Sequence, residues 1–210
     1  MSEPKPRTPE ALLATFGPID IYVFDQLLRG RITPDMRILD AGCGPGRNAE
    51  YLMRCGADLY GVDSDPRQIA RVRGLAGRVA PQLTPDHFVV APLSDLPFAD
   101  HFFGAVICSA VLHFSESSEA FEAAMAEMWR VLGSGGVFFA RLASSIGIED
   151  RVTRLHDRWH HLPDGSDRFL VDEAYLEGVV LALGAEQLDP LKTTIVQNMR
   201  AMTTWVLRKS

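Results

Sequence analysis

Three glycines stand at alternating positions after a short apolar segment, in a pattern that lets a ligand lie close to the backbone. Residues 38–48 read ILDAGCGPGRN, so that Gly42, Gly44 and Gly46 follow Asp40. Open α/β sheets bind ligands where a strand enters such a loop and a helix then begins. Glycine leaves room there because it has no side chain. The alternative for these glycines alone is a tight strand-to-helix turn with no ligand.

A carboxylate downstream strengthens the interpretation of a nucleotide-type ligand. Asp63 ends a second apolar segment at residues 59–62. A carboxylate at the end of the second strand can accept hydrogen bonds from both hydroxyls of a ribose. The alternative is that Asp63 caps a helix beginning near Pro66. Because the glycines and the carboxylate occur together, we favour the ribose.

The segments that must position these residues alternate between short apolar runs and helical patterns. Apolar runs predict strands at residues 37–41, 59–62, 88–90, 104–109 and 137–142. Helical spacing predicts helices at residues 12–30, 47–55, 66–75 and 119–132. This alternation is typical of a parallel sheet with helices on both faces and right-handed crossovers. The fold class is therefore a doubly wound α/β sheet.

The last third of the chain has a different pattern. A helix is expected at residues 172–183, stopped by Gly184, and strands at 187–194 and 200–208. The link between these strands is too short for a parallel crossover, so we expect them to pair antiparallel. We interpret residues 1–210 as a single domain, with residues 1–30 as an N-terminal helical cap. Residues 144–169 are expected to form a lid insert over the substrate.

The lid insert combines an apolar pattern with charged residues. Apolar residues at helical spacing predict a helix whose stripe is Ile148, Val152, Leu155, Trp159 and Leu162. His156 and His160 stand four residues apart and could ligate a metal, but no third ligand has convincing spacing, so no metal is expected.

Composition limits the classes of partner. The chain has 210 residues, 47% of them hydrophobic, and a net charge of -6, which makes nucleic acid an unlikely partner. No apolar run is long enough to span a membrane, and the polar start at residues 1–10 lacks the apolar region of a signal peptide. Three cysteines without CxxC spacing fit reduced thiols. We therefore expect a cytoplasmic protein, either a monomer or a homodimer.

Taken together, the motifs resemble those of class I methyltransferases that use S-adenosylmethionine (SAM), of the small-molecule, type 11-like kind. The resemblance spans roughly residues 35–142 and is carried by DAGCGPG at 40–46, GVD at 61–63, LPF at 96–98, VLHF at 111–114, and RVL at 130–132 before two glycines. It implies a Rossmann-like, mostly parallel seven-stranded sheet with an antiparallel last strand. It also implies methyl transfer from SAM to a small-molecule acceptor (EC 2.1.1.-), with S-adenosylhomocysteine (SAH) as product.

The resemblance carries cofactor-binding roles to particular positions. Asp40 and Gly42 would line the methionine end of SAM, Gly44 and Gly46 would allow close approach, and Asp63 would hold the ribose with Ser64 beside the adenine. The other cofactor candidates are Cys43, Arg47, Leu93, Ser94 and Ser109. One position departs from the family pattern, because Pro92 stands where an aspartate usually accepts from the adenine amino group. The backbone of Leu93 or Ser94, or the side chain of Asp95, is then left to make this contact.

Acceptor residues are less well marked. His113 follows the fourth strand and is the candidate general base, since histidine changes protonation near neutral pH. The alternative is that His113 packs beside Phe114 and caps the next helix. The other candidates for substrate contact are Tyr22, Arg141 and Trp159.

Two rival functions remain open. A non-catalytic SAM- or SAH-binding regulatory module would retain the glycine loop without turnover. An NAD-dependent oxidoreductase would show the spacing G-x-G-x-x-G, whereas position 47 is Arg47.

Overall fold

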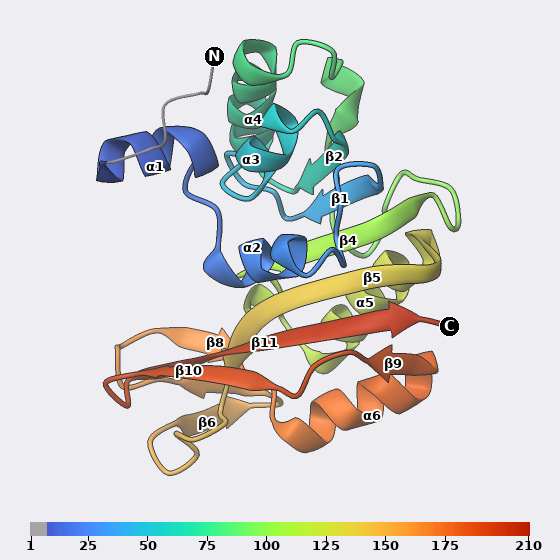
Figure 1. Ribbon diagram of the computed structural model, residues 1–210. Helices are drawn as coiled ribbons and strands as arrows, with labels where there is room; N and C mark the ends of the chain where they lie inside the picture. The colour runs from blue at the N-terminus through green and yellow to red at the C-terminus, as the bar shows by residue number, and fades with distance from the viewer. Residues whose placement is uncertain (1–7) are drawn as a thin grey trace.

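The computed structural model describes residues 8–210. The expected cap at residues 1–30 and the polar start at 1–10 are therefore described only from Thr8 onward, and residues 1–7 lie outside the described part of the chain. The elements are arranged around one large twisted sheet with helices on both sides (Figure 1).

The large sheet has the order β10-β11-β5-β4-β1-β2-β3, and β9 also pairs with β11. Its strands are β1 (Arg37–Ala41), β2 (Asp58–Asp63), β3 (Phe88–Val90), β4 (Phe103–Ser109), β5 (Leu132–Ser144), β9 (Ala185–Gln187), β10 (Lys192–Val196) and β11 (Arg200–Lys209). The pairs among β1 to β5 are parallel, whereas β11 is antiparallel to β5, β9 and β10. Because β9 and β10 lie along the same edge of β11, they share the seventh position of the sheet. The predicted mostly parallel sheet with an antiparallel last strand is confirmed.

Helices cover both faces of the sheet. They are α1 (Pro9–Phe16), α2 (Ile21–Leu28), α3 (Ala49–Arg54), α4 (Pro66–Val79), α5 (Ser118–Val131) and α6 (Glu173–Leu183), with short 3-10 turns at Pro85–His87 and Leu112–Phe114. Successive residues of β1 point to opposite faces, as the pleat requires. Ile38 packs in the cluster that contains residues of α2, α3 and α4, and Leu39 packs in the cluster that contains α5 and α6.

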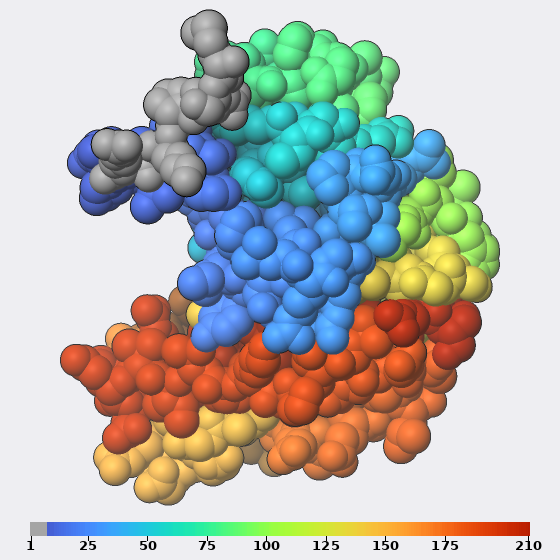
Figure 2. All heavy atoms as spheres, in the orientation of Figure 1, coloured from blue at the N-terminus to red at the C-terminus, as the bar shows by residue number. Residues whose placement is uncertain are grey.

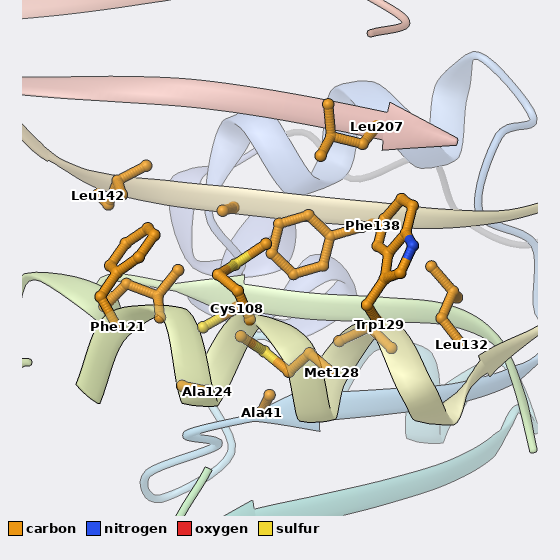
Figure 3. Packing of buried hydrophobic residues seen from close by; sticks show 14 of the residues in the cluster. Ala41, Cys108, Phe121, Ala124, Met128, Trp129, Leu132, Phe138, Leu142 and Leu207 are labelled. Carbon is orange, nitrogen blue, oxygen red and sulfur yellow. The ribbon is translucent and has the colours of Figure 1, made fainter. Parts of the chain in front are cut away.

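The face under α5 shows how the sheet is held (Figure 3). Phe121, Met128 and Trp129 of α5 belong to the same buried cluster as Cys108 of β4 and Phe138 of β5. These positions follow the helical spacing seen in the sequence, so the amphipathic face of α5 is confirmed. Cys108 is fully buried among apolar side chains and acts as a packing residue.

The N-terminal segment forms two helices rather than the single helix predicted at residues 12–30. Gly17 ends α1 with φ of 65°, and the Asp20 side chain caps α2 by accepting from Tyr22 N. In the described residues no single helix is long and apolar enough to cross a membrane. Only α1 and α2 taken together, across a bend of 69°, reach that length and composition.

The prediction of a helix in the insert at residues 144–169 is wrong, because the insert contains no helix. It forms a three-stranded antiparallel sheet of β6 (Thr153–His156), β7 (Trp159–His161) and β8 (Asp167–Phe169). The expected stripe is split: Ile148 and Leu162 are buried, whereas Leu155 is 51% exposed. A turn around Gly165, with φ of 82°, joins β7 to β8.

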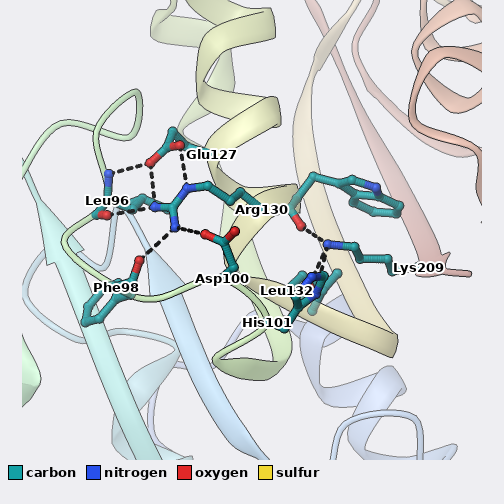
Figure 4. A network of polar contacts seen from close by, with 9 residues as sticks. Leu96, Phe98, Asp100, His101, Glu127, Arg130, Leu132 and Lys209 are labelled. Atoms are coloured by element: carbon teal, nitrogen blue, oxygen red, sulfur yellow. Dashed lines mark hydrogen bonds and ion pairs between the residues drawn. The ribbon is translucent and has the colours of Figure 1, made fainter.

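An ion-pair network fixes the connection from β3 to β4 (Figure 4). The Arg130 guanidinium donates to the backbone oxygens of Leu96 (3.0 Å) and Phe98 (2.8 Å) and to the Asp100 carboxylate (2.7 Å). It also pairs with Glu127 (2.7 Å), which accepts from Leu96 N (2.9 Å). Charge-assisted bonds to backbone groups hold a loop more firmly than neutral ones. This network anchors the segment that leads away from residues 93 and 94.

Candidate active site

The three glycines of the loop after β1 all have positive φ, at 75° for Gly42, 53° for Gly44 and 96° for Gly46. Their surroundings differ. A side chain at Gly46 would meet Leu75 at 2.8 Å and Val72 at 3.0 Å, so this glycine lets α4 pack closely. A side chain at Gly44 would meet nothing within 4 Å. Gly44 therefore presents bare backbone to open space, as close ligand approach requires.

Asp63, at the carboxyl end of β2, is tied to this loop. Its carboxylate accepts from Gly44 N (2.9 Å) and from Asp65 N (2.9 Å). Each carboxylate oxygen retains a lone pair for a further donor. The residue that caps α4 is Asp65, which accepts from Arg67 N, so capping is not the role of Asp63. Ser64 lies beside Asp63 and is exposed.

Asp40 lies near the end of β1 and is 2% exposed. Within residues 8–210 its Oδ2 has no hydrogen-bond partner. Burial raises the pKa of Asp40 to about 7; the Asp63 carboxylate acts in the same direction and Arg47 opposes it. An unpartnered buried carboxyl oxygen is rare in proteins, so this oxygen needs a donor that residues 8–210 do not supply.

A third carboxylate, that of Asp20, lies near the ends of β4 and β5. Asp20 pairs with Arg141 at 3.1 Å and approaches Arg47 at 3.7 Å. Arg47 also donates weakly to the Ser109 hydroxyl at 3.5 Å. The backbone N of Asp20 donates to the side chain of Asn48 at 3.0 Å. These contacts dock α2 on the loop after β1.

The segment after β3 carries the candidates for adenine contact. Leu93 is partly buried, whereas Pro92, Ser94 and Asp95 are exposed. The Asp95 backbone N donates to Pro92 O at 3.3 Å, so a turn presents residues 93 and 94. Leu93 and Ser94 also line a cavity of about 490 Å³ together with Val111. The structure thus brings the segment after β3 beside the segment after β4.

Beyond β4 the backbone is strained and polar groups are buried. Ala110 has φ of 64°, a left-handed conformation that costs an alanine roughly 1 kcal/mol. His113 is 7% exposed, and its Nδ1 lacks a hydrogen-bond partner in the described residues. Burial lowers the pKa of His113 to about 4, with Arg168 and Arg141 acting in the same direction. His113 packs against Phe114 at 4.5 Å between ring centroids, but Ser117 is the residue that caps the next helix.

The remaining predicted acceptor residues lie in different places. The guanidinium carbon of Arg141 lies 5.3 Å from the centroid of the Tyr22 ring. The Tyr22 hydroxyl shares a hydrogen bond of 2.6 Å with Thr194 of β10. The Trp159 indole instead donates to Ser115 O at 2.8 Å, so Trp159 anchors the insert to the segment after β4.

The cysteines and histidines form no second reactive group. Cys43 and Cys108 are buried, Cys55 is exposed, and all three are free. Burial raises the pKa of both buried thiols, which makes them inert at neutral pH. The described residues contain no group of three or more candidate metal ligands, and His156 lies near Trp159 rather than near a third ligand.

Three functional candidates escaped the sequence analysis. Asp20 had a local signal, since an aspartate directly before an apolar helix is a typical N-cap. Arg168 and Arg200 line a cavity with His113 and Arg141, although they belong to separate segments. No local pattern could have brought these two arginines together.

A parallel sheet of this strand order, with an antiparallel strand beside β5 and an acid-and-glycine loop after β1, defines a class I SAM-dependent methyltransferase fold. Residues 39–140 match the family model described as Methyltransf_11, a methyltransferase domain. This part of the chain is a type 11 methyltransferase domain, as the motifs indicated.

Relatives and solved structures agree with this assignment. The chain is 28% identical over 169 residues to malonyl-[acyl-carrier protein] O-methyltransferase of Enterobacter lignolyticus, which covers 79% of this chain and 61% of the relative. The chain thus spans about three fifths of that relative's length. The fold is similar to the PH0226 protein of Pyrococcus horikoshii, with a TM-score of 0.70, 18% identity, and coverage of 97% of this chain and 93% of that one.

A further structure with a similar fold carries ligands. It is the 1,6-didemethyltoxoflavin-N1-methyltransferase of Burkholderia thailandensis, with bound 1,6-didemethyltoxoflavin and SAH. Its TM-score is 0.69 at 20% identity, over 95% of this chain and 81% of that one.

Proposed function

We propose that this protein transfers a methyl group from SAM to a small-molecule acceptor. The observation that carries the proposal is that Asp40 and Asp63 lie at the carboxyl ends of neighbouring strands, beside the loop that contains Gly44. One carboxylate is buried with an unpartnered oxygen, the other is held against the loop, and Gly44 faces open space.

These residues fit the cofactor by their chemistry. The unpartnered oxygen of Asp40 suits the cationic amino group at the methionine end of SAM. Asp63 keeps lone pairs for the two ribose hydroxyls, and Gly44 offers bare backbone beside it. We assign the adenine contact to Ser64, Leu93 and Ser94, which follow the carboxyl ends of β2 and β3.

Four further candidates have supporting roles in this proposal. Gly42 and Cys43 form part of the loop after β1. The Arg47 guanidinium donates a hydrogen bond to the Ser109 hydroxyl beside this loop.

The sulfonium of SAM supplies an already activated methyl group, which an acceptor takes by in-line displacement. The protein's own contribution is then alignment and exclusion of water, which can be worth several kcal/mol. α2 serves this purpose, because Asp20 ties it to Arg141 and Tyr22 ties it to β10. The β6–β8 sheet is proposed as the lid on the acceptor side.

His113 is neutral at physiological pH, since its pKa is about 4. A base with so low a pKa takes up a proton weakly, so we assign His113 a positioning role through its free Nδ1. Acceptors that arrive without a proton to lose fit this site best.

The partner and compartment complete the proposal. The net charge of -6 favours a small-molecule acceptor over nucleic acid. The exposed free thiol of Cys55 fits a reducing compartment, so we propose a cytoplasmic location.

The test is a transfer assay with SAM labelled in its methyl group and a panel of small carboxylic acids, phenols, amines and thiols. We expect labelled product and an equal amount of SAH with at least one acceptor class. Tight binding of SAM with no SAH formed across the panel would instead favour a regulatory module. Preferential binding of NAD would favour an oxidoreductase.

A further inference from the structure

A cavity of about 260 Å³ lies beyond the carboxyl ends of β4 and β5. Its walls come from four parts of the chain: the segment after β4, the end of β5, the turn and strand of β7–β8, and the β10–β11 hairpin. The polar residues of the lining are His113, Arg141, Asp164, Ser166, Arg168 and Arg200. Figure 2 shows the molecule hollowed on the side where α1 and the β10–β11 turn both project.

The lining of this cavity carries a net positive charge. It has three arginines and a single acid, and His113 carries no charge at neutral pH. The acid, Asp164, is already engaged, because its carboxylate accepts from the hydroxyl (2.6 Å) and the backbone N (3.0 Å) of Ser166. These bonds, together with Arg200 and Arg168, hold the pKa of Asp164 low against the opposing effect of burial.

Two of the arginines lack an ion-pair partner in the described residues. Arg141 pairs with Asp20 at 3.1 Å. Among residues 8–210, neither Arg168 nor Arg200 has a carboxylate within ion-pair distance. Arg168 is held in place, since it lies 5.0 Å from the Phe114 ring centroid and donates to Asp167 O at 2.6 Å. A guanidinium so placed presents its remaining N–H groups to an anion.

The remainder of the lining is apolar. Ala143 and Leu162 are buried side chains of one small cluster, and Met202 packs against it. Val196 lines the same cavity from β10. An apolar wall with a few convergent polar groups is typical of a small-molecule site.

We propose that this cavity binds the acceptor, and that the acceptor is a small carboxylic acid with an apolar body. Arg168 and Arg200 bind its carboxylate, while Ala143, Leu162 and Met202 contact the body. Arg141 lies between this cavity and Asp20, and so links the acceptor site to α2. This inference rests on the proposed methyltransferase function and adds the class of its substrate.

The probes are three compounds with the same ring: benzoate, its neutral analogue benzamide, and phenyl phosphate. Each is titrated into wild-type protein by calorimetry, with and without SAH. We expect benzoate to bind at least tenfold more tightly than benzamide, because benzoate can form ion pairs with the arginines and neutral benzamide cannot. Equal binding of benzoate and benzamide, or no binding of benzoate, would overturn the proposal. Tighter binding of phenyl phosphate than of benzoate would overturn the carboxylate assignment.

The variants are Arg200→Gln and Arg168→Gln, with Arg151→Gln as matched control. Arg151 lies in the same insert, is exposed, and pairs only with its neighbour Asp150 at 3.4 Å. Arg200→Gln and Arg168→Gln should each weaken benzoate binding at least tenfold, and Arg151→Gln should leave it unchanged. Equal effects of all three variants would contradict a defined site, because the same charge is lost in each.

SAH binding, measured in the same samples, separates the two proposals. Unchanged SAH affinity in Arg200→Gln shows that the protein is folded and that the cofactor site is intact. SAH binding without benzoate binding would overturn only the acceptor assignment. Benzoate binding that depends on Arg200, without any SAH binding, would support the acid site and count against the cofactor.

Discussion

The carboxylate of Asp63 accepts a hydrogen bond of 2.9 Å from the backbone N–H of Gly44. This bond joins the end of β2 to the loop after β1, which are neighbouring strands in the sheet. The ribose site that we propose is therefore pre-formed, because its carboxylate is held against the loop on which the ligand would lie.

Asp63 and Asp65 are close in sequence but differ in role, which gives a matched pair of variants. Asp63→Ala should weaken SAH binding about 10- to 100-fold, because bonds to a charged acceptor contribute roughly 1.5–3 kcal/mol. Asp65→Ala removes the N-cap of α4 and should lower the free energy of unfolding by about 1 kcal/mol with SAH affinity retained. Equilibrium dialysis and urea unfolding measure the two quantities. Equal loss of SAH affinity in both variants would contradict the ribose assignment.

Variants of Gly44 and Gly46 distinguish a role in ligand binding from a role in packing. Gly46→Ala should lower the free energy of unfolding by about 3 kcal/mol, since the new methyl group meets Leu75 at 2.8 Å and φ is 96°. Gly44→Ala meets no atom within 4 Å and should cost only about 1 kcal/mol from its positive φ. Gly44→Ala should nevertheless reduce SAH affinity at least tenfold. If it binds SAH as the wild type does, the ligand does not approach the backbone at Gly44.

Asp40 should make stability depend on pH in an unusual direction. Burial raises its pKa to about 7, whereas an unfolded aspartate titrates near ~3.9. Between these values the folded protein holds a proton that the unfolded chain has lost. The contribution of Asp40 to stability is therefore fully present below pH ~4 and falls, by about 1.4 kcal/mol for each pH unit, until pH rises past 7.

The check on Asp40 is urea unfolding of wild type and Asp40→Asn between pH 4 and 8. The difference in unfolding free energy between the two proteins should shift in favour of the variant as pH rises. A difference that does not change with pH would mean that Asp40 titrates normally in the folded protein.

Asp20 should hold α2 in place through its charge. Asp20→Asn keeps an oxygen to cap α2 but weakens the contact with Arg141, so we expect a loss of about 1–2 kcal/mol in unfolding free energy. Asp25→Asn is the control on the same helix, because Asp25 makes more exposed pairs with Arg29 and Lys192 that contribute at most about 1 kcal/mol. Equal losses in the two variants would remove the special role of Asp20.

The sequence was most informative where one short segment contains all the residues that define a motif. Residues 38–48 hold strand, loop and helix start together, so the site at the end of β1 could be placed from local spacing. The insert was misassigned because apolar residues at helical intervals also occur by chance in short strands. Pro163-Asp164-Gly165 is a turn sequence that argued against a continuous helix.

Contacts between distant segments were beyond prediction. Asp20 meets Arg141 because the N-terminal segment lies against β5. Arg168 and Arg200 line one cavity because the insert and the last hairpin fold over the ends of β4 and β5. The pKa values of Asp40 and His113 likewise depend on burial, which local sequence does not specify.

The central claim is that the loop after β1 and Asp63 bind SAM. Calorimetric titration of SAM, SAH and NAD into the wild-type protein tests this claim most directly. We predict one binding site per chain for SAM and for SAH, with no comparable heat from NAD. Failure of folded protein to bind SAM and SAH, or preferential binding of NAD, would contradict the account.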